Sequence, residues 1–156
     1  MRIHVDKIGS VTRNLQLGRS LTLSDQFLVE PGSVVACRVH GEKSTYNQLE
    51  DPYGRLVTLH QSDLVVGALG HRNALHGYEG VMPTQLKVGD TLHMLNMGGV
   101  MGLCQSHNPD VGEPFRLEVL GQVMLFPEFQ SRIGQPAHIS MGALQRRDSS
   151  VHCPVV

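Results

Sequence analysis

Residues 83–96 read PTQLKVGDTLHMLN, in which Gly89 and Asp90 form a polar turn ahead of an apolar, extended segment. A related spacing occurs 27 residues earlier, in LHQSDLV at 59–65. Both segments have a Leu, an Asp four residues later and an apolar residue two positions further on. Each therefore predicts a tight turn that leads directly into a short strand.

Similar short units occur along the rest of the chain. Pro31 and Gly32 predict a turn before VVACRV at 34–39, and FRLEV at 115–119 alternates between apolar and charged residues. Helical periodicity is almost absent, apart from a short helix suggested at 141–150. Further brief strands are expected at Ile3–Val5, Leu15–Leu17, Leu21–Leu23 and within 56–69. We therefore predict an all-β fold, a small closed or partly open β-barrel of short antiparallel strands with little helix, in which residues 1–156 form one domain.

The bulk composition is that of a globular protein with its own core. The chain has 156 residues, 40% of them apolar, and a formal net charge of -1. Its 13 Lys and Arg are scattered and Trp is absent, so the sequence lacks the basic stripe and the stacking aromatics of a nucleic-acid binder. The three cysteines are far apart, which argues against a disulfide framework. No apolar run approaches the roughly 20 residues that span a bilayer, so we expect a cytoplasmic protein without nucleic-acid or membrane partners.

The segment PTQLKVGDTLHMLN resembles the turn-and-strand units of the SAF-type and related cradle-loop barrels. In those barrels an apolar residue, a Gly-Asp or Gly-Glu pair and then an apolar pair introduce a strand. The resemblance covers residues 83–96 only, and it implies a barrel. Some members of that group bind sugar acids or accompany sugar-acid dehydratases, so the resemblance also implies a polar ligand that carries a carboxylate. It assigns no catalytic residue.

The glycine-bounded loop HRNALHGY at 71–78 holds the candidate catalytic residues His71, His76 and Tyr78. An imidazole titrates near neutral pH and acts as a general acid or base, while a phenol donates a hydrogen bond to an oxyanion. Arg72 and Asn73 are candidate ligand-binding residues, since a guanidinium matches a carboxylate with two parallel donors. The alternative is a polar surface loop without chemistry.

The glycine-rich segment NMGGVMG at 96–102 adds Asn96, Gly98 and Gly99 as candidate ligand-binding residues. Successive glycines after a strand can aim several backbone N–H groups at one point, where an anion or a developing oxyanion binds. The segment has no P-loop lysine and no following helical pattern, so it is not a dinucleotide fingerprint. A plain glycine bend at a barrel corner is the alternative. We expect the loops at 67–78 and 96–107 to line one mouth of the barrel.

Cys104 and His107 are candidate metal ligands, because thiolate and imidazole groups hold zinc in tetrahedral sites. No second half of a metal motif, such as CxxC or HxxxH, accompanies them. A catalytic thiolate at Cys104 requires a nearby charge that lowers the pKa of the thiol. Additional ligands would come from the other histidines or the final segment: His71, His76, His93, His152 and Cys153.

Together these features favour a small-molecule-binding β-barrel, either a binding protein or an enzyme that performs acid/base chemistry on a carboxylate-bearing substrate. Two alternatives stay open: a non-catalytic oligomeric or accessory barrel, and a metal-binding barrel. The apolar final segment VHCPVV favours a homo-oligomer, because such segments usually dock on their own fold or on a neighbouring subunit. Val155 and Val156 would then lie in the subunit interface. The sequence indicates no particular cofactor.

Overall fold

A computed structural model gives the structure of the chain and describes residues 1–74, 76–127 and 133–143. Within these ranges the fold is all-β with two short 3-10 helices, η1 (Ser10–Leu15) and η2 (Pro109–Val111). No helix in these ranges is long and apolar enough to cross a membrane. The strands are β1 (Arg2–His4), β2 (Lys7–Ile8), β3 (Ser20–Ser24), β4 (Val34–His40), β5 (Gln48–Glu50), β6 (Leu56–Thr58), β7 (Leu64–Leu69), β8 (Tyr78–Val81), β9 (Thr91–Met94), β10 (Val100–His107), β11 (Arg116–Leu125) and β12 (Gln135–Pro136).

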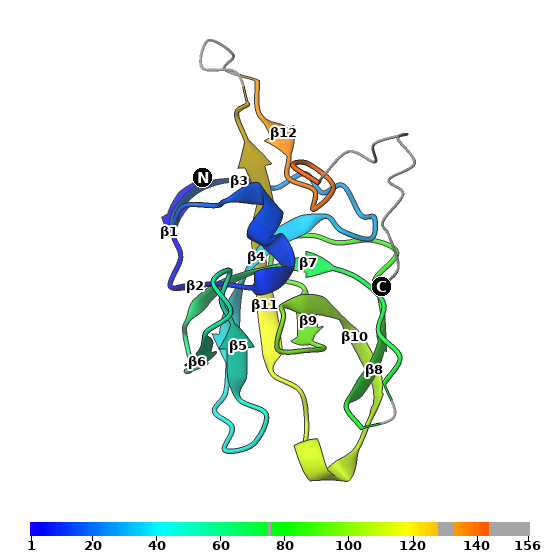
Figure 1. Cartoon of the computed structure of the whole chain (residues 1–156). Coiled ribbons are helices and arrows are strands. Elements are labelled where there is room, and N and C mark those ends of the chain that lie inside the picture. Colours follow the sequence, from blue (N-terminus) through cyan, green and yellow to red (C-terminus); the bar gives the residue numbers. More distant parts are fainter. Residues whose placement is uncertain (75, 128–132, 144–156) are drawn as a thin grey trace, which may run out of the picture.

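One large sheet contains ten of these strands, and β5 pairs with β6 in a separate hairpin. The main path through the sheet is β1–β3–β11–β4–β7–β10–β8. Because β9 pairs with both β10 and β11, the path β11–β4–β7–β10–β9 returns to its starting strand. The long strand β11 runs through the centre of this arrangement (Figure 1). The predicted all-β, barrel-like fold is therefore confirmed.

The sheet differs from the predicted antiparallel arrangement at β7. This strand pairs in parallel with β2, where Lys7 lies opposite Val65, and in parallel with β10, where Ala68 lies opposite Val100. Parallel neighbours need a long crossover connection, and short local patterns in a sequence do not report such connections. The fold is a mixed sheet for this reason.

Strand β4 is buried on both faces, which explains its continuous apolar sequence. Val35, Cys37 and Val39 belong to one hydrophobic cluster, whereas Val34 and Ala36 belong to another. Alternate residues of a strand point to opposite faces, so β4 separates the two clusters. Cys37 is fully buried in the core, and this burial raises the pKa of its thiol.

The two turns predicted from the repeated spacing have the same hydrogen bonds. The Asp63 carboxylate accepts a bond from the His60 amide at 2.6 Å, and the Asp90 carboxylate accepts one from the Lys87 amide at 3.0 Å. The residue before each aspartate has a positive φ, 72° in the first turn and 88° in the second. The repeat in the sequence thus corresponds to a repeat in structure.

The equivalence of these turns extends to their neighbours. The carbonyl of Asp63 accepts a bond from the Val39 amide in β4, and the carbonyl of Asp90 accepts one from the Val119 amide in β11, each at 2.9 Å. Strands β4 and β11 in turn pair with each other in antiparallel orientation. The two turns are therefore related positions at the centre of the sheet.

The strand predicted at Leu15–Leu17 is wrong, because residues Ser10–Leu15 form the 3-10 helix η1. The Thr12 hydroxyl donates to the Gly9 carbonyl at 2.9 Å, and the Thr12 amide donates to the same oxygen at 3.0 Å. Such local bonds from Thr to the backbone compete with strand pairing. Gln16 then ends the helix in a left-handed conformation.

Some predictions fall outside the described residues. The short helix predicted at 141–150 extends past residue 143, and the apolar segment at 151–156 lies wholly outside. Val155 and Val156, with the homo-oligomer expected from them, therefore stay predictions, as does the single domain of 1–156. The additional metal ligands proposed at His152 and Cys153 also lie outside the described residues.

Candidate functional site

The two predicted loops lie next to each other because β8 and β10 form an antiparallel pair. Tyr78, at the start of β8, lies opposite His107, at the end of β10. The pairing is irregular between Cys104 and Ser106, where β10 contains an extra residue. A bulge of this kind re-aims the side chains beyond it.

A shallow hollow of about 380 Å³ lies where these loops meet. It brings together two residues predicted from separate segments, Asn73 and His107. It also contains Glu79, whose carboxylate accepts a bond from the Ser106 hydroxyl at 3.0 Å. We call it the mouth hollow, and it is lined by Asn73, Ala74, Gly77, Glu79, Ser106, His107, Asn108 and Pro109.

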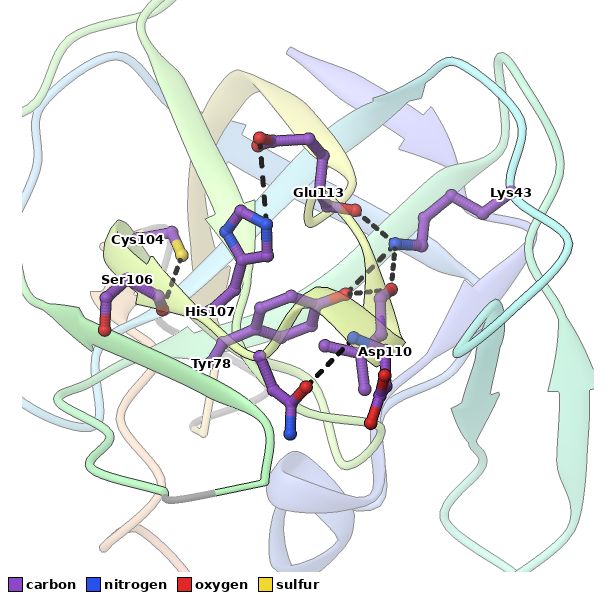
Figure 2. A network of polar contacts seen from close by, with 9 residues as sticks. Lys43, Tyr78, Cys104, Ser106, His107, Asp110 and Glu113 are labelled. Atoms are coloured by element: carbon purple, nitrogen blue, oxygen red, sulfur yellow. Dashed lines mark hydrogen bonds and ion pairs between the residues drawn. The ribbon is translucent and has the colours of Figure 1, made fainter.

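A lysine that the sequence analysis did not single out anchors the wall beside this hollow (Figure 2). The Lys43 ammonium donates to the Tyr78 hydroxyl at 3.0 Å, to the Val111 carbonyl at 2.9 Å and to the Glu113 carbonyl. An ammonium has three donors, so these bonds use all of them. Lys43 thus ties the 109–113 segment to β8. Burial lowers its pKa, and the nearby Glu113 partly opposes this shift.

Tyr78 is 1% exposed and its hydroxyl faces this anchor. The hydroxyl donates to the Val111 carbonyl at 3.3 Å. Burial, followed by the nearby Tyr46, Cys104 and Glu113, raises the pKa of Tyr78 to about 12, so the phenol stays neutral. The donation of a hydrogen bond from Tyr78 to a substrate oxyanion stays a prediction.

His107 is the imidazole that lines the mouth hollow. Its Nε2 lies 3.8 Å from the Glu113 carboxylate, and its ring centroid lies 6.4 Å from that of Tyr78. Figure 2 shows His107 beside both groups. With 28% of its side chain exposed, His107 can contact a bound molecule while a carboxylate lies next to it. This is the arrangement of a general acid or base with a carboxylate neighbour.

Cys104 and His93 form a neutral pair. The Cys104 amide donates to His93 Nδ1 at 3.1 Å, and the Cys104 thiol donates to the Ser106 carbonyl at 3.3 Å. Burial and Glu113 raise the pKa of the Cys104 thiol, while burial lowers the pKa of the His93 imidazole. Neither group carries the charge that an activated thiolate pair requires.

The candidate metal ligands Cys104 and His107 both lie on β10. Among residues 1–74, 76–127 and 133–143, no three His, Cys, Asp or Glu side chains come together in a group that could hold a metal ion. Metal binding by this barrel therefore stays a prediction, and the described residues do not provide a complete set of ligands for it.

Arg72 points inward rather than into the mouth hollow. Its Nη1 donates to the Tyr46 hydroxyl at 3.2 Å and to the Leu95 carbonyl. The guanidinium lies directly behind Gly77, because a Cβ built on that glycine would be 3.1 Å from Arg72 Nη2. Since Gly77 lines the hollow, the arginine supplies positive charge behind its wall.

His71 and His76, the other predicted catalytic residues, are exposed. His71 Nδ1 accepts a bond from the Met82 amide at 3.3 Å, which fixes the ring beside β8. His76 lies next to Gly77 in the chain, at the edge of the mouth hollow. Neither ring lines that hollow, so their roles in proton transfer stay predictions.

Asn96, Gly98 and Gly99 form a turn that packs against the N-terminal segment. The Asn96 side chain accepts a bond from the Val100 amide at 2.9 Å and so closes the turn. The carbonyls of Gly98 and Gly99 accept bonds from the Val11 and Ala68 amides, and Gly99 has a φ of 95°. These residues do not line the mouth hollow. Their arrangement is that of a plain glycine bend, which was the alternative interpretation of this segment. Their contacts with a ligand stay predictions.

Sequence reasoning missed Lys43 because its partners are distant in the chain. Lys43 lies 35 residues from Tyr78 and 68 residues from Val111. The available signal was a lone lysine within a polar turn, which resembles any solvated turn residue. Only the fold places its ammonium against Tyr78 and the 109–113 segment.

Comparison with protein-family models, curated proteins and solved structures finds no match to this chain. The resemblance of residues 83–96 to cradle-loop barrels therefore stays a prediction. The function has to be inferred from the chemistry of the site.

Proposed function

We propose that this protein binds a small, polar, carboxylate-bearing molecule in the mouth hollow. The observation that carries the proposal is the meeting of two loops, distant in sequence, around a space of about 380 Å³ lined with hydrogen-bonding side chains. This volume lies within the range of roughly 300–1,000 Å³ typical of ligand pockets. A lining of this kind suits a ligand with several polar groups.

The side chains around the hollow supply donors for such a ligand. The Asn108 side chain uses its oxygen to accept the Asp110 amide at 2.9 Å, which leaves its amino group free for a ligand. Asn73 is exposed and lines the same hollow. The Arg72 guanidinium behind Gly77 favours the carboxylate end of a ligand, because its charge lies close to the wall.

The same site supports acid/base chemistry if the bound molecule reacts. His107 lines the hollow, and its Nε2 lies 3.8 Å from the Glu113 carboxylate, the geometry of an acid/base group beside a carboxylate. The Lys43 anchor bonds to the backbone carbonyl of Glu113 and so fixes the segment that carries this carboxylate. His107 is thus the group we assign to proton transfer, with His71 and His76 at the periphery.

A panel of sugar acids and hydroxy acids, screened by thermal shift and then by calorimetry, tests this proposal. A ligand present at about 100 times its Kd adds about 2.7 kcal/mol to the free energy of unfolding, a shift of several degrees in Tm for a chain of this length. We expect His107→Gln and Asn73→Ala to weaken binding of the selected acid by about tenfold.

His60→Gln is the matched control, because His60 is an exposed histidine outside the mouth hollow. It should bind the acid as the wild-type protein does. The proposal is wrong if no acid in the panel binds, or if His107→Gln, Asn73→Ala and His60→Gln all retain wild-type affinity.

A further inference from the structure

A second, larger groove lies away from the mouth hollow. Its volume is about 610 Å³, and its walls come from η1, the 16–19 segment, β2 and the tip of the β5–β6 hairpin. Apolar side chains, Ile8, Leu17 and Val57, form part of its lining. Its remaining lining is rich in cationic side chains, which the scattered positions in the sequence did not reveal.

Two of the cations in this groove have no partner among the described residues. Lys7 pairs with Asp63, and Arg55 pairs with Asp51 at 2.9 Å. The side chains of Arg13 and Arg19, by contrast, form no hydrogen bond or ion pair with any residue in the described ranges, and both are exposed.

The carboxylates of the groove are already occupied. Asp51 accepts bonds from the Tyr53 and Arg55 amides, each at 2.9 Å, in addition to the Arg55 side chain. The carboxylate of Asp6 accepts a bond from the Leu64 amide at 2.8 Å. The lining of the groove holds four cations, Lys7, Arg13, Arg19 and Arg55, against two carboxylates, Asp6 and Asp51, so the groove keeps an excess of positive charge.

An exposed aromatic ring stands at the rim of the groove on a fixed turn. Tyr53 is 84% exposed, and the Arg55 guanidinium lies 5.5 Å from its ring centroid. The bonds to Asp51 define the turn, in which Gly54 adopts a φ of 80°. These bonds fix the backbone that carries Tyr53, and the exposed ring offers contact area to a ligand.

We propose that this groove is a second ligand site, which takes a small organic anion with an apolar or aromatic body. Arg13 and Arg19 bind its oxyanion group, because a guanidinium forms charge-assisted hydrogen bonds with a carboxylate or a phosphate. The body of the ligand lies on the apolar lining and against the Tyr53 ring. The site is independent of the mouth hollow, with which it shares no lining residue.

Calorimetric titration of the whole chain with phenyl phosphate, benzoate and benzyl alcohol tests the proposal. The two anions should bind and the neutral alcohol should bind much more weakly. Binding of phenyl phosphate alone assigns the site to phosphate esters, binding of benzoate alone assigns it to carboxylates, and either result supports an oxyanion site. Tyr53→Ala should weaken phenyl phosphate more than it weakens inorganic phosphate.

The double variant Arg13→Gln/Arg19→Gln should bind the anions at least tenfold more weakly, because each charged hydrogen bond contributes substantially to affinity. Arg116→Gln is the control: it makes the same kind of substitution at one exposed arginine in a separate hollow beside His40 and Thr91.

Amide chemical shifts of Gln16 and Gly18, which line the groove, provide a second measurement. They should move on addition of phenyl phosphate in the wild-type protein and in Arg116→Gln. The proposal fails if neither anion binds the wild-type protein, or if the double arginine variant binds them as Arg116→Gln does. It also fails if the shifts of these amides stay constant while binding is observed.

Discussion

The substitution Gly9→Ala tests whether the 96–99 turn is a packed bend. Gly9 has an ordinary extended conformation, so alanine fits its φ and ψ angles. A Cβ at this position would nevertheless lie 2.7 Å from the Gly98 carbonyl oxygen and 3.0 Å from the Gly99 Cα, both of them backbone atoms. Backbone atoms cannot rotate away as a side chain does. The two segments must therefore move apart.

The cost of this movement has two parts. Overpacking in a tight contact costs about 1–3 kcal/mol. The separation also strains the bonds from the Gly9 amide to the Val66 carbonyl, at 2.8 Å, and from the Val11 amide to the Gly98 carbonyl, at 2.9 Å. Each hydrogen bond contributes about 1 kcal/mol net. With the overpacking cost, we expect Gly9→Ala to lower the free energy of unfolding by about 3 kcal/mol. For a chain of this length, that corresponds to a decrease in Tm of about 10 °C.

Urea denaturation of the wild-type protein, Gly9→Ala and Gly18→Ala measures this loss. Gly18 is the control because a Cβ there would have no atom within 4 Å. Its replacement by alanine should leave the free energy of unfolding unchanged or raise it by up to about 1 kcal/mol, through a less flexible unfolded chain. If Gly9→Ala unfolds within about 0.5 kcal/mol of the wild-type protein, the 96–99 turn does not act as a rigid partner of the N-terminal segment.

The remaining predictions concern titratable groups of the site. Burial lowers the pKa of His93 below its ordinary 6.5, so the unfolded chain binds more protons as pH falls through this value, and the free energy of unfolding should decrease below about pH 6.5. His93→Asn should reduce that decrease in pH-dependent urea denaturation, and an unchanged pH profile would contradict it. Iodoacetamide at neutral pH should label Cys104 slowly and Cys37 only after unfolding, because burial raises the pKa of both thiols. Peptide mass mapping distinguishes these sites, and rapid labelling of either thiol in the folded protein would be inconsistent with the structure.

Local patterns were sufficient to predict the parts of the fold that depend on neighbours in sequence. The aspartates of the two repeated turns bond to amides three residues before them, so the spacing itself records the turn. The alternation in β11 likewise places Leu117 and Val119 in the core and leaves Arg116 exposed. The parallel pairing of β7 depends on distant strands, and no short pattern encodes it.

In the candidate site, too, the features that depend on local sequence could be predicted and those that depend on distant residues could not. The meeting of Asn73 with His107 could be predicted because both lie on loops assigned to one mouth of the barrel. The inward direction of Arg72 could not be predicted, since it depends on the Leu95 carbonyl and the Tyr46 hydroxyl, which come from other parts of the chain. The free arginines of the second groove were missed because isolated basic residues in a sequence do not reveal which of them find partners.

The position of β11 has a consequence for the synthesis of the protein. This strand pairs with β3, β4, β9 and β12. Strands β3 and β4 are synthesised early, but they can form these pairs only after the chain from Arg116 onward has been made. A nascent chain that has not reached this residue carries unpaired strand edges and uncovered apolar faces. Folding is therefore largely completed after most of the chain has left the ribosome, and a truncated translation product that lacks β11 should be captured by chaperones or degraded.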